Sequence, residues 1–267
     1  MKAPELSYYN IADGIISFST TRHGGCSRGN YGEFNINEYC GDEAEAIKEN
    51  RKALAAELGI DADHMIIPHQ THGIETRQIA EDFLSLPENI RKMILEGVDA
   101  VMTNIKGVCV GVSTADCIPI LLYDPEHEAV CAVHAGWRGT VARIVMKAVT
   151  EMRLAYQTIP SDLKAVIGQG ISLDAFEVGN EVYEEFANAN FEMDAISKQM
   201  KVAGTDFEYK WHIDLKECNR RQLLQCGINE ENILVSDVCT YNNVEDFFSA
   251  RRLGTASGRI YSGIIIR

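Results

Sequence analysis

The sequence predicts a single mixed α/β domain of the α+β type, and three observations support this prediction. The chain has 267 residues, of which 46% are hydrophobic and 24% charged, as in globular proteins that bury a large core. No internal repeat, low-complexity block or Pro/Gly/Ser-rich linker interrupts it, so we expect one domain over residues 1–267. Strand-like runs and helical stripes alternate too irregularly for a Rossmann fold or a barrel.

The first helix is expected over residues 42–58. Asp42 and Glu45 form a capping-box pattern at its start, and Gly59 follows as a terminator. Short strand-like runs dominate after this helix, many of them rich in β-branched residues. Several are continuously apolar, which is typical of strands covered on both faces. These runs are residues 64–68, 75–79, 99–104, 108–113, 118–124 and 129–135.

Beyond Gly139 the hydrophobic period becomes helical. An i, i+3, i+4, i+7 stripe extends from Val141 to Met152, and Thr140 is a candidate N-cap. The motif HAGWRG, residues 134–139, is therefore expected at a strand-to-helix junction. Later we expect a strand at 164–168, helices at about 178–189 and after the capping-box pair Asp214 and Glu217, and strands at 232–236 and 259–267.

Charge and cysteine content narrow the classes of function. With 39 acidic and 25 basic residues the formal net charge is -14, which disfavours nucleic acids and anionic membranes as partners. A few arginines can still make one pocket positive for a small anion. No apolar run is long enough to span a bilayer, and the first ten residues lack a secretory signal, so we expect a cytoplasmic protein. The eight cysteines form no CxxC pair and are expected to be reduced.

Three glycine-flanked segments concentrate metal-binding side chains at the ends of predicted strands: residues 68–73, 114–117 and 134–139. We expect them to converge, with His72, Cys117 and His134 as ligands. Two imidazoles and one thiolate suit Zn²⁺, and three protein ligands leave a position open for water or substrate, as in catalytic zinc sites. His72, beside Gly73, is preferred to His69 as the ligand. His69 is a candidate for a residue that contacts a ligand without binding the metal itself.

Acidic and basic residues near these segments are candidates for other roles. Asp116 could accept a proton or orient a ligand, and a capped turn is the structural alternative. Arg138 precedes a predicted helix N-terminus that favours an anion, although a solvated arginine is an equal interpretation. Arg22, in the glycine-rich loop 21–29, and Arg252, in a basic cluster at 248–252 and 258–259, complete the candidates for phosphate binding.

Together these segments resemble the laccase-domain or YfiH-like family, whose members are known as polyphenol oxidases, peptidoglycan-editing factors and purine nucleoside phosphorylases. The resemblance covers nearly the whole chain, and the combination of TADC with HAGWRG is its most specific part. The matching segments are TRHGGCSRG (21–29), QTHG (70–73), DAVMT (99–103), TADCIP (114–119), HAGWRG (134–139), EVG (177–179) and FFSARR (247–252).

The resemblance implies zinc bound by His72, Cys117 and His134, in agreement with the choice made from the residues. It also implies a four-layer α/β/β/α sandwich with mixed sheets. The implied activity is cytosolic phosphorolysis of adenosine, inosine and methylthioadenosine, with some adenosine deamination. One departure is visible: residues 167–171 read IGQGI, where family members usually carry an IGPCI-like stretch with cysteine and proline.

Four functional hypotheses follow. The first is a zinc enzyme that uses a nucleoside and phosphate; the HxE glutamate of deaminases is absent, so Asp116 or His69 would move the proton. The second is a copper oxidase, which the seven histidines and the absence of HxH pairs oppose. The third is a hydrolase or editing factor for peptidoglycan precursors with Cys117 as nucleophile. The fourth is an interaction protein with structural zinc, which needs a fourth ligand. A homodimer is compatible with each.

Overall fold

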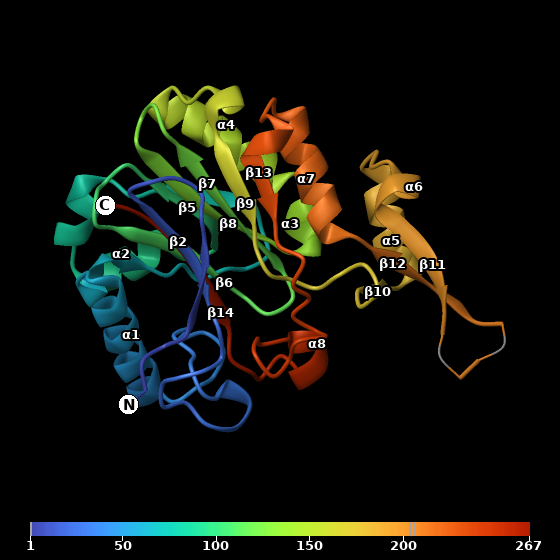
Figure 1. Cartoon of the computed structure of the whole chain (residues 1–267), viewed down its shortest axis with the longest axis horizontal. Coiled ribbons are helices and arrows are strands. Elements are labelled where there is room, and N and C mark those ends of the chain that lie inside the picture. The colour runs from blue at the N-terminus through green and yellow to red at the C-terminus, as the bar shows by residue number, and fades with distance from the viewer. Residues whose placement is uncertain (1, 203, 206) are drawn as a thin grey trace.

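Two mixed β-sheets packed face to face form the centre of the fold in the computed structural model, which describes residues 2–202, 204–205 and 207–267 (Figure 1). The five-stranded sheet has the order β1 (Leu6–Tyr9), β2 (Ile15–Thr20), β14 (Ile260–Ile266), β6 (Cys109–Thr114), β3 (Met65–Ile66). The six-stranded sheet has the order β13 (Ile233–Val235), β9 (Lys164–Ile167), β7 (Ile118–Asp124), β8 (Ala129–Ala135), β5 (Val98–Thr103), β4 (Glu75–Gln78).

The space between the two sheets is filled by apolar side chains from both. Val110 and Ile264 of the first sheet belong to one buried cluster with Leu121, Val130 and Val166 of the second. Every residue of β5, β6, β7, β8 and β14 is buried. The continuously apolar runs in the sequence are therefore strands covered on both faces, as predicted.

Helices cover the two outer faces of the sheet pair. On the five-stranded sheet, Leu54 and Leu58 of α1 (Ala44–Leu58) pack against Phe18 and Ile265. On the six-stranded sheet, α4 (Ile144–Tyr156) and α7 (Leu215–Gln225) pack into the largest apolar cluster. Figure 1 shows α1 on the opposite side of the sheets from α4 and α7. The fold is therefore the four-layer α/β/β/α sandwich that was expected.

A smaller antiparallel sheet lies beside the sandwich (Figure 1). Its strands are β10 (Glu177–Val178), β12 (Tyr209–Ile213) and β11 (Ser197–Lys201), in that order. Tyr183 of α5 (Asn180–Asn188) stacks on Trp211 of β12 with ring centroids 3.9 Å apart, which fixes this helix on the small sheet. The remaining helices are α2 (Glu88–Ile94), α3 (Trp137–Val141), α5 (Asn180–Asn188), α6 (Met193–Ile196) and α8 (Ala250–Leu253).

Two details of the expected helices were wrong. Asp42 does not cap α1, whose N-cap is Glu43 without a side-chain bond, because the Asp42 carboxylate accepts hydrogen bonds from Ser27 and Asn35 instead. The helix after Gly139 is not continuous either. Arg143 adopts the left-handed conformation with φ 65° and separates α3 from α4, so Thr140 lies inside α3 and not at an N-cap.

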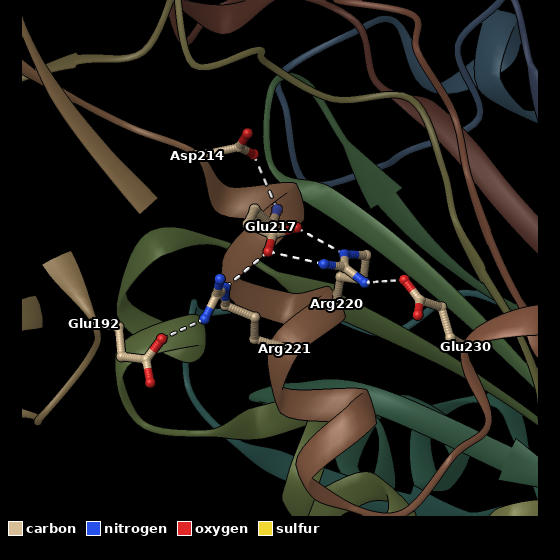
Figure 2. A network of polar contacts seen from close by, with 6 residues as sticks. All are labelled: Glu192, Asp214, Glu217, Arg220, Arg221 and Glu230. Carbon is tan, nitrogen blue, oxygen red and sulfur yellow. Dashed lines mark hydrogen bonds and ion pairs between the residues drawn. The ribbon is translucent and has the colours of Figure 1, made fainter. Parts of the chain in front are cut away.

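The start of α7 is fixed by its cap and by an ionic network (Figure 2). Asp214 accepts a hydrogen bond of 2.9 Å from the backbone N–H of Glu217, which confirms the predicted N-cap. The Glu217 carboxylate in turn accepts from the guanidinium groups of Arg220 and Arg221. Arg221 also pairs with Glu192, at the start of α6, so the network ties α7 to the small sheet's helices.

In the described part of the chain, none of the helices combines the length and the hydropathy required to cross a membrane.

The N-cap of α7 yields a testable prediction. Asp214→Ala should lower the free energy of unfolding by about 1 kcal/mol, because the N–H of Glu217 loses its acceptor. Glu43→Ala is the matched control, since Glu43 occupies the N-cap of α1 without a side-chain cap bond and should change stability little. Urea denaturation of both variants measures the difference, and equal losses would contradict the assignment.

Candidate metal centre

Three side chains that lie far apart in the sequence meet at one end of the sheet pair. His72 lies in the loop between β3 and β4, Cys117 in the turn between β6 and β7, and His134 near the end of β8. One ligand atom from each lies within 4.8 Å of the others. The structure therefore brings together the three residues that the sequence singled out. We call them the HCH triad.

Two of the triad's loops have left-handed backbone conformations. His72 has φ 63° and Asp116, next to Cys117, has φ 84°. Non-glycine residues adopt this region rarely, and it costs free energy that the surroundings must offset. Asp116 is held by three contacts: its backbone carbonyl accepts from the N–H of Ile171, and its carboxylate accepts from Thr240 and from the N–H of Arg251. Cys117 is positioned as a result.

Asp99 is the acceptor that holds the other two ligands. This fully buried carboxylate, in β5, accepts a 2.7 Å hydrogen bond from Nδ1 of His134. It also accepts from the backbone N–H groups of Thr71, His72 and Gly73 at 3.2, 3.0 and 2.8 Å. Because an ionised carboxylate only accepts, Nδ1 of His134 carries the hydrogen and Nε2 is left for a metal.

Glycine allows the two histidines and the cysteine to approach one another. A Cβ atom on Gly136 would lie 2.9 Å from Cδ2 of His72 and 3.1 Å from Sγ of Cys117. Only a residue without a side chain fits between the ligands without displacing them. Gly136 is also the N-cap residue of α3, so the motif HAGWRG forms the strand-to-helix junction that was predicted.

The charges of the triad depend on one another. Burial raises the pKa of the Cys117 thiol, but the charge of His134 and hydrogen bonds from both histidines outweigh burial and lower it to about 6. Burial lowers the pKa of His134, whereas Cys117 and Asp99 raise it to about 9. Burial also raises the pKa of Asp99, but His134 and the N–H groups of the 71–73 loop hold it below its ordinary value. Thiolate, imidazole and carboxylate therefore stabilise one another.

The donor set fits a metal ion. Tetrahedral zinc with bonds of about 2.0 to 2.3 Å needs donors roughly 3.5 Å apart, so donors within 4.8 Å need only small side-chain shifts. With a pKa of about 6, Cys117 is mostly a thiolate at neutral pH, and the hydrogen bond to Asp99 orients His134 as carboxylates orient metal-bound histidines. Within residues 2–202, 204–205 and 207–267, this is the one group of His, Cys and acidic side chains with such spacing.

The triad lines a cavity of about 210 Å³. His69, the other histidine of HQTH, also lines it, but its Nδ1 bonds to Glu96 at 2.8 Å and its ring stacks on Tyr39. The ring centroids are 4.2 Å apart, so the two rings form one aromatic surface. The cavity therefore combines metal ligands with an aromatic side. Its lining also includes Asn37, Ser113, Thr114 and Arg259.

The other residues singled out in the sequence lie outside this lining. Asp116 is buried, and both of its carboxylate oxygens already accept hydrogen bonds. Arg22 donates to the carbonyl groups of Gly32 and Val244 and lies over the ring of Phe248. These contacts place Asp116 and Arg22 in roles that hold neighbouring loops together.

Arg138 and Arg252 are exposed arginines that lie over aromatic rings. The guanidinium carbon of Arg138 is 4.2 Å from the ring centroid of Trp137, and that of Arg252 is 5.0 Å from the ring of Tyr241. In the described part of the chain, neither is among the residues that line the cavity.

Sequence reasoning overlooked Asp99 and the role of Gln169. Asp99 is the one charged residue in the fully buried strand β5, and an unpaired carboxylate there signals a partner. Gln169, in the stretch that departs from the family pattern, is buried and bonds to the hydroxyls of Tyr9 and Ser7. Gln169 therefore belongs to the packing between β1 and the six-stranded sheet. Gly170, the next residue of this stretch, lies against the turn of the triad, where a Cβ atom would be 3.1 and 3.2 Å from the carbonyl oxygens of Asp116 and Cys117.

Asp99→Asn should weaken zinc binding by about 10- to 100-fold, because it removes the charge that orients His134 and the 71–73 loop. Competition with a chromophoric chelator measures the affinity. Asp124→Asn is the matched control: Asp124 is also buried and bonds to His127 and to backbone N–H groups, but it lies outside the cavity lining. Equal zinc affinity in wild type and Asp99→Asn would refute the positioning role.

Comparison with known proteins finds relatives that match nearly the whole chain. It is 45% identical to a purine nucleoside phosphorylase of Bacteroides thetaiotaomicron, over 97% of this chain and 93% of the relative. It is 40% identical to adenosine deaminase RL5 of an unknown prokaryotic organism, over 97% of both chains. The crystal structure of the hypothetical protein YfiH of Bacillus licheniformis superimposes with a TM-score of 0.87 at 27% identity, over 99% of this chain and 97% of that one.

The family model described as multi-copper polyphenol oxidoreductase laccase matches residues 16–267. This match includes all three residues of the HCH triad and Asp99. Since the match and both relatives cover nearly the whole sequence, the chain belongs to this laccase-domain family, together with the YfiH-like proteins.

Proposed function

We propose that this chain is a zinc-dependent purine nucleoside phosphorylase that acts on adenosine, inosine and methylthioadenosine, with accompanying adenosine deaminase activity. The observation that carries the proposal is the HCH triad in the lining of a cavity, in a chain 45% identical to a purine nucleoside phosphorylase. The relative named adenosine deaminase RL5 supports the second activity. As the sequence predicts, we place the reaction in the cytoplasm, with a nucleoside and phosphate as partners.

Zinc is favoured over copper by the ligands. One thiolate and two imidazoles suit Zn²⁺, and three protein ligands are typical of a catalytic zinc site. A multicopper oxidase needs many more histidines, and this chain has seven in total, of which two are in the triad. When bound, zinc would polarise a substrate oxygen or lower the pKa of water at the open position.

The cavity residues would divide the other tasks. The aromatic surface of Tyr39 and His69 would support the purine base, since stacking recognises any base through its face. Because Nδ1 of His69 is engaged by Glu96, its Nε2 is the nitrogen left to exchange a proton with substrate. Of the two proton carriers suggested by the sequence, His69 therefore suits the role, and Asp116 acts by positioning Cys117.

The zinc-loaded protein should convert inosine and phosphate to hypoxanthine and ribose 1-phosphate in equal amounts, as measured by chromatography. Release of base should depend on phosphate. His134→Asn should abolish turnover, whereas His127→Asn, which removes a histidine bonded to Asp124 outside the cavity lining, should retain it. No turnover by the zinc-loaded wild type, or phosphate-independent release of base, would sink the phosphorylase proposal.

A second candidate is a cysteine-dependent hydrolase for peptidoglycan precursors, which the lowered pKa of Cys117 favours. The two candidates differ in their need for metal. Chelation should abolish a zinc-dependent activity and zinc should restore it. Activity that survives chelation but is lost on thiol alkylation would favour the nucleophile.

The same thiol can be titrated chemically. In chelator-stripped protein, iodoacetamide should alkylate Cys117 half-maximally near pH 6, since the thiolate forms above its pKa of about 6. Cys26 is the internal control, because burial and nearby Glu49 and Asp42 raise its pKa above the ordinary value and its alkylation should rise only in alkaline solution. Peptide mass spectrometry over a pH series distinguishes the two, and coincident curves would contradict the thiolate assignment.

A further inference from the structure

We propose that Arg259 forms the phosphate subsite beside the HCH triad. This inference rests on the proposed phosphorylase function and specifies where its second substrate binds. It replaces the arginines singled out from the sequence with a residue that lines the same cavity as the triad. Three observations support it: the charge of the lining, the contacts of Arg259, and the sheet register that places Arg259 near the triad.

The charge of the cavity is opposite to that of the chain. The protein carries 39 acidic residues against 25 basic ones, yet no carboxylate is among the described residues that line the cavity. Among the described residues that line the cavity, Arg259 is the one lysine or arginine. Without a neighbouring carboxylate, its charge remains available to a ligand and makes this cavity positive on an acidic protein. A small anion is the ligand that such a cavity favours.

The guanidinium of Arg259 is held in place by neutral groups. Its Nη1 donates to the carbonyl oxygens of Ser257 and Gly258 at 2.6 and 2.9 Å, and its Nη2 donates to that of Thr255 at 3.0 Å. These bonds fix its orientation without neutralising its charge. In the described part of the chain it forms no ion pair, and Nε–H has no acceptor. A preorganised arginine with a free donor is suited to bind an oxyanion.

The sheet register places Arg259 beside the end of β6, the strand that leads to Cys117. In the five-stranded sheet, Ile260 of β14 pairs with Thr114 of β6, and Tyr261 pairs with Ser113. Arg259 directly precedes Ile260, so it lies at the end of β14 next to the end of β6. Three residues after Thr114 the chain reaches Cys117 of the triad. An anion bound by Arg259 would thus lie beside the metal ligands that line the same cavity, where phosphate must meet the nucleoside.

The test compares phosphate and nucleoside dependence in zinc-loaded full-length variants. Arg259→Gln should raise the KM for phosphate at least about tenfold, with a smaller change in the KM for inosine, because a charged hydrogen-bond donor is lost. Arg259→Lys should lie between wild type and Arg259→Gln, since it keeps the charge but loses the planar donor. Arg153→Gln, which removes an exposed arginine from α4, is the matched control and should leave both values unchanged.

The Tm and the zinc affinity of each Arg259 variant guard against a folding defect, because Arg259 also bonds to the carbonyl groups of Thr255, Ser257 and Gly258. Arg259→Lys with wild-type Tm and a raised KM for phosphate would support the subsite. An unchanged phosphate KM in Arg259→Gln would overturn the subsite, as would an increase found only in Arg138→Gln or Arg252→Gln.

Direct binding separates this proposal from the proposed function. Inorganic phosphate alone is titrated into zinc-loaded wild type and Arg259→Gln by calorimetry. Tighter binding to wild type, by about tenfold or more, supports the subsite even if the wild type shows no phosphorolysis. Equal binding to both proteins, combined with active phosphorolysis by wild type, overturns the subsite and leaves the phosphorylase function in place.

Discussion

The carboxylate of Asp99 is the group on which the arrangement of the metal centre depends. Strand β5 pairs with β4 on one side and β8 on the other. Asp99 can therefore reach the loop that leads into β4, which carries His72, and the ring of His134 in β8. One buried charge thus links three neighbouring strands. Its burial is tolerated because four hydrogen-bond donors surround it.

The loops of the triad show how a rigid frame can hold an unfavourable backbone. Left-handed residues at His72 and Asp116 cost roughly 1 to 3 kcal/mol each. Buried hydrogen bonds to Asp99 on one side, and from Thr240 and Arg251 on the other, make the alternative conformations still less favourable. The ligands are therefore preorganised by polar contacts that do not themselves belong to the cavity.

The sequence predicts elements whose stability is local or whose pattern is strongly apolar. The strands from β5 to β8 and the cap at Asp214 are of this kind. Two of the ligands depend on these strands, since Cys117 lies between β6 and β7 and His134 lies near the end of β8. The sequence does not predict contacts that depend on distant partners. The sequence pattern predicts Asp42 as a helix cap, but in the structure its carboxylate accepts hydrogen bonds from Ser27 and Asn35. In the sequence, Arg259 is one member of a basic cluster. Its position in the cavity lining depends on the pairing of β14 with β6, which the sequence does not predict.

The position of β14 has a consequence for how the protein folds. This strand lies between β2 and β6 in the five-stranded sheet, so residues 15–19 pair with residues 262–266, which are synthesised much later. Such long-range pairing makes folding slow, because a long loop must close before the contacts form. On the ribosome, the metal ligands and β6 would emerge well before β14. Thr240 and Arg251, which hold Asp116 beside Cys117, also emerge late. The ligands are therefore synthesised early, but the site is completed only when β14 and the segment before it take their places.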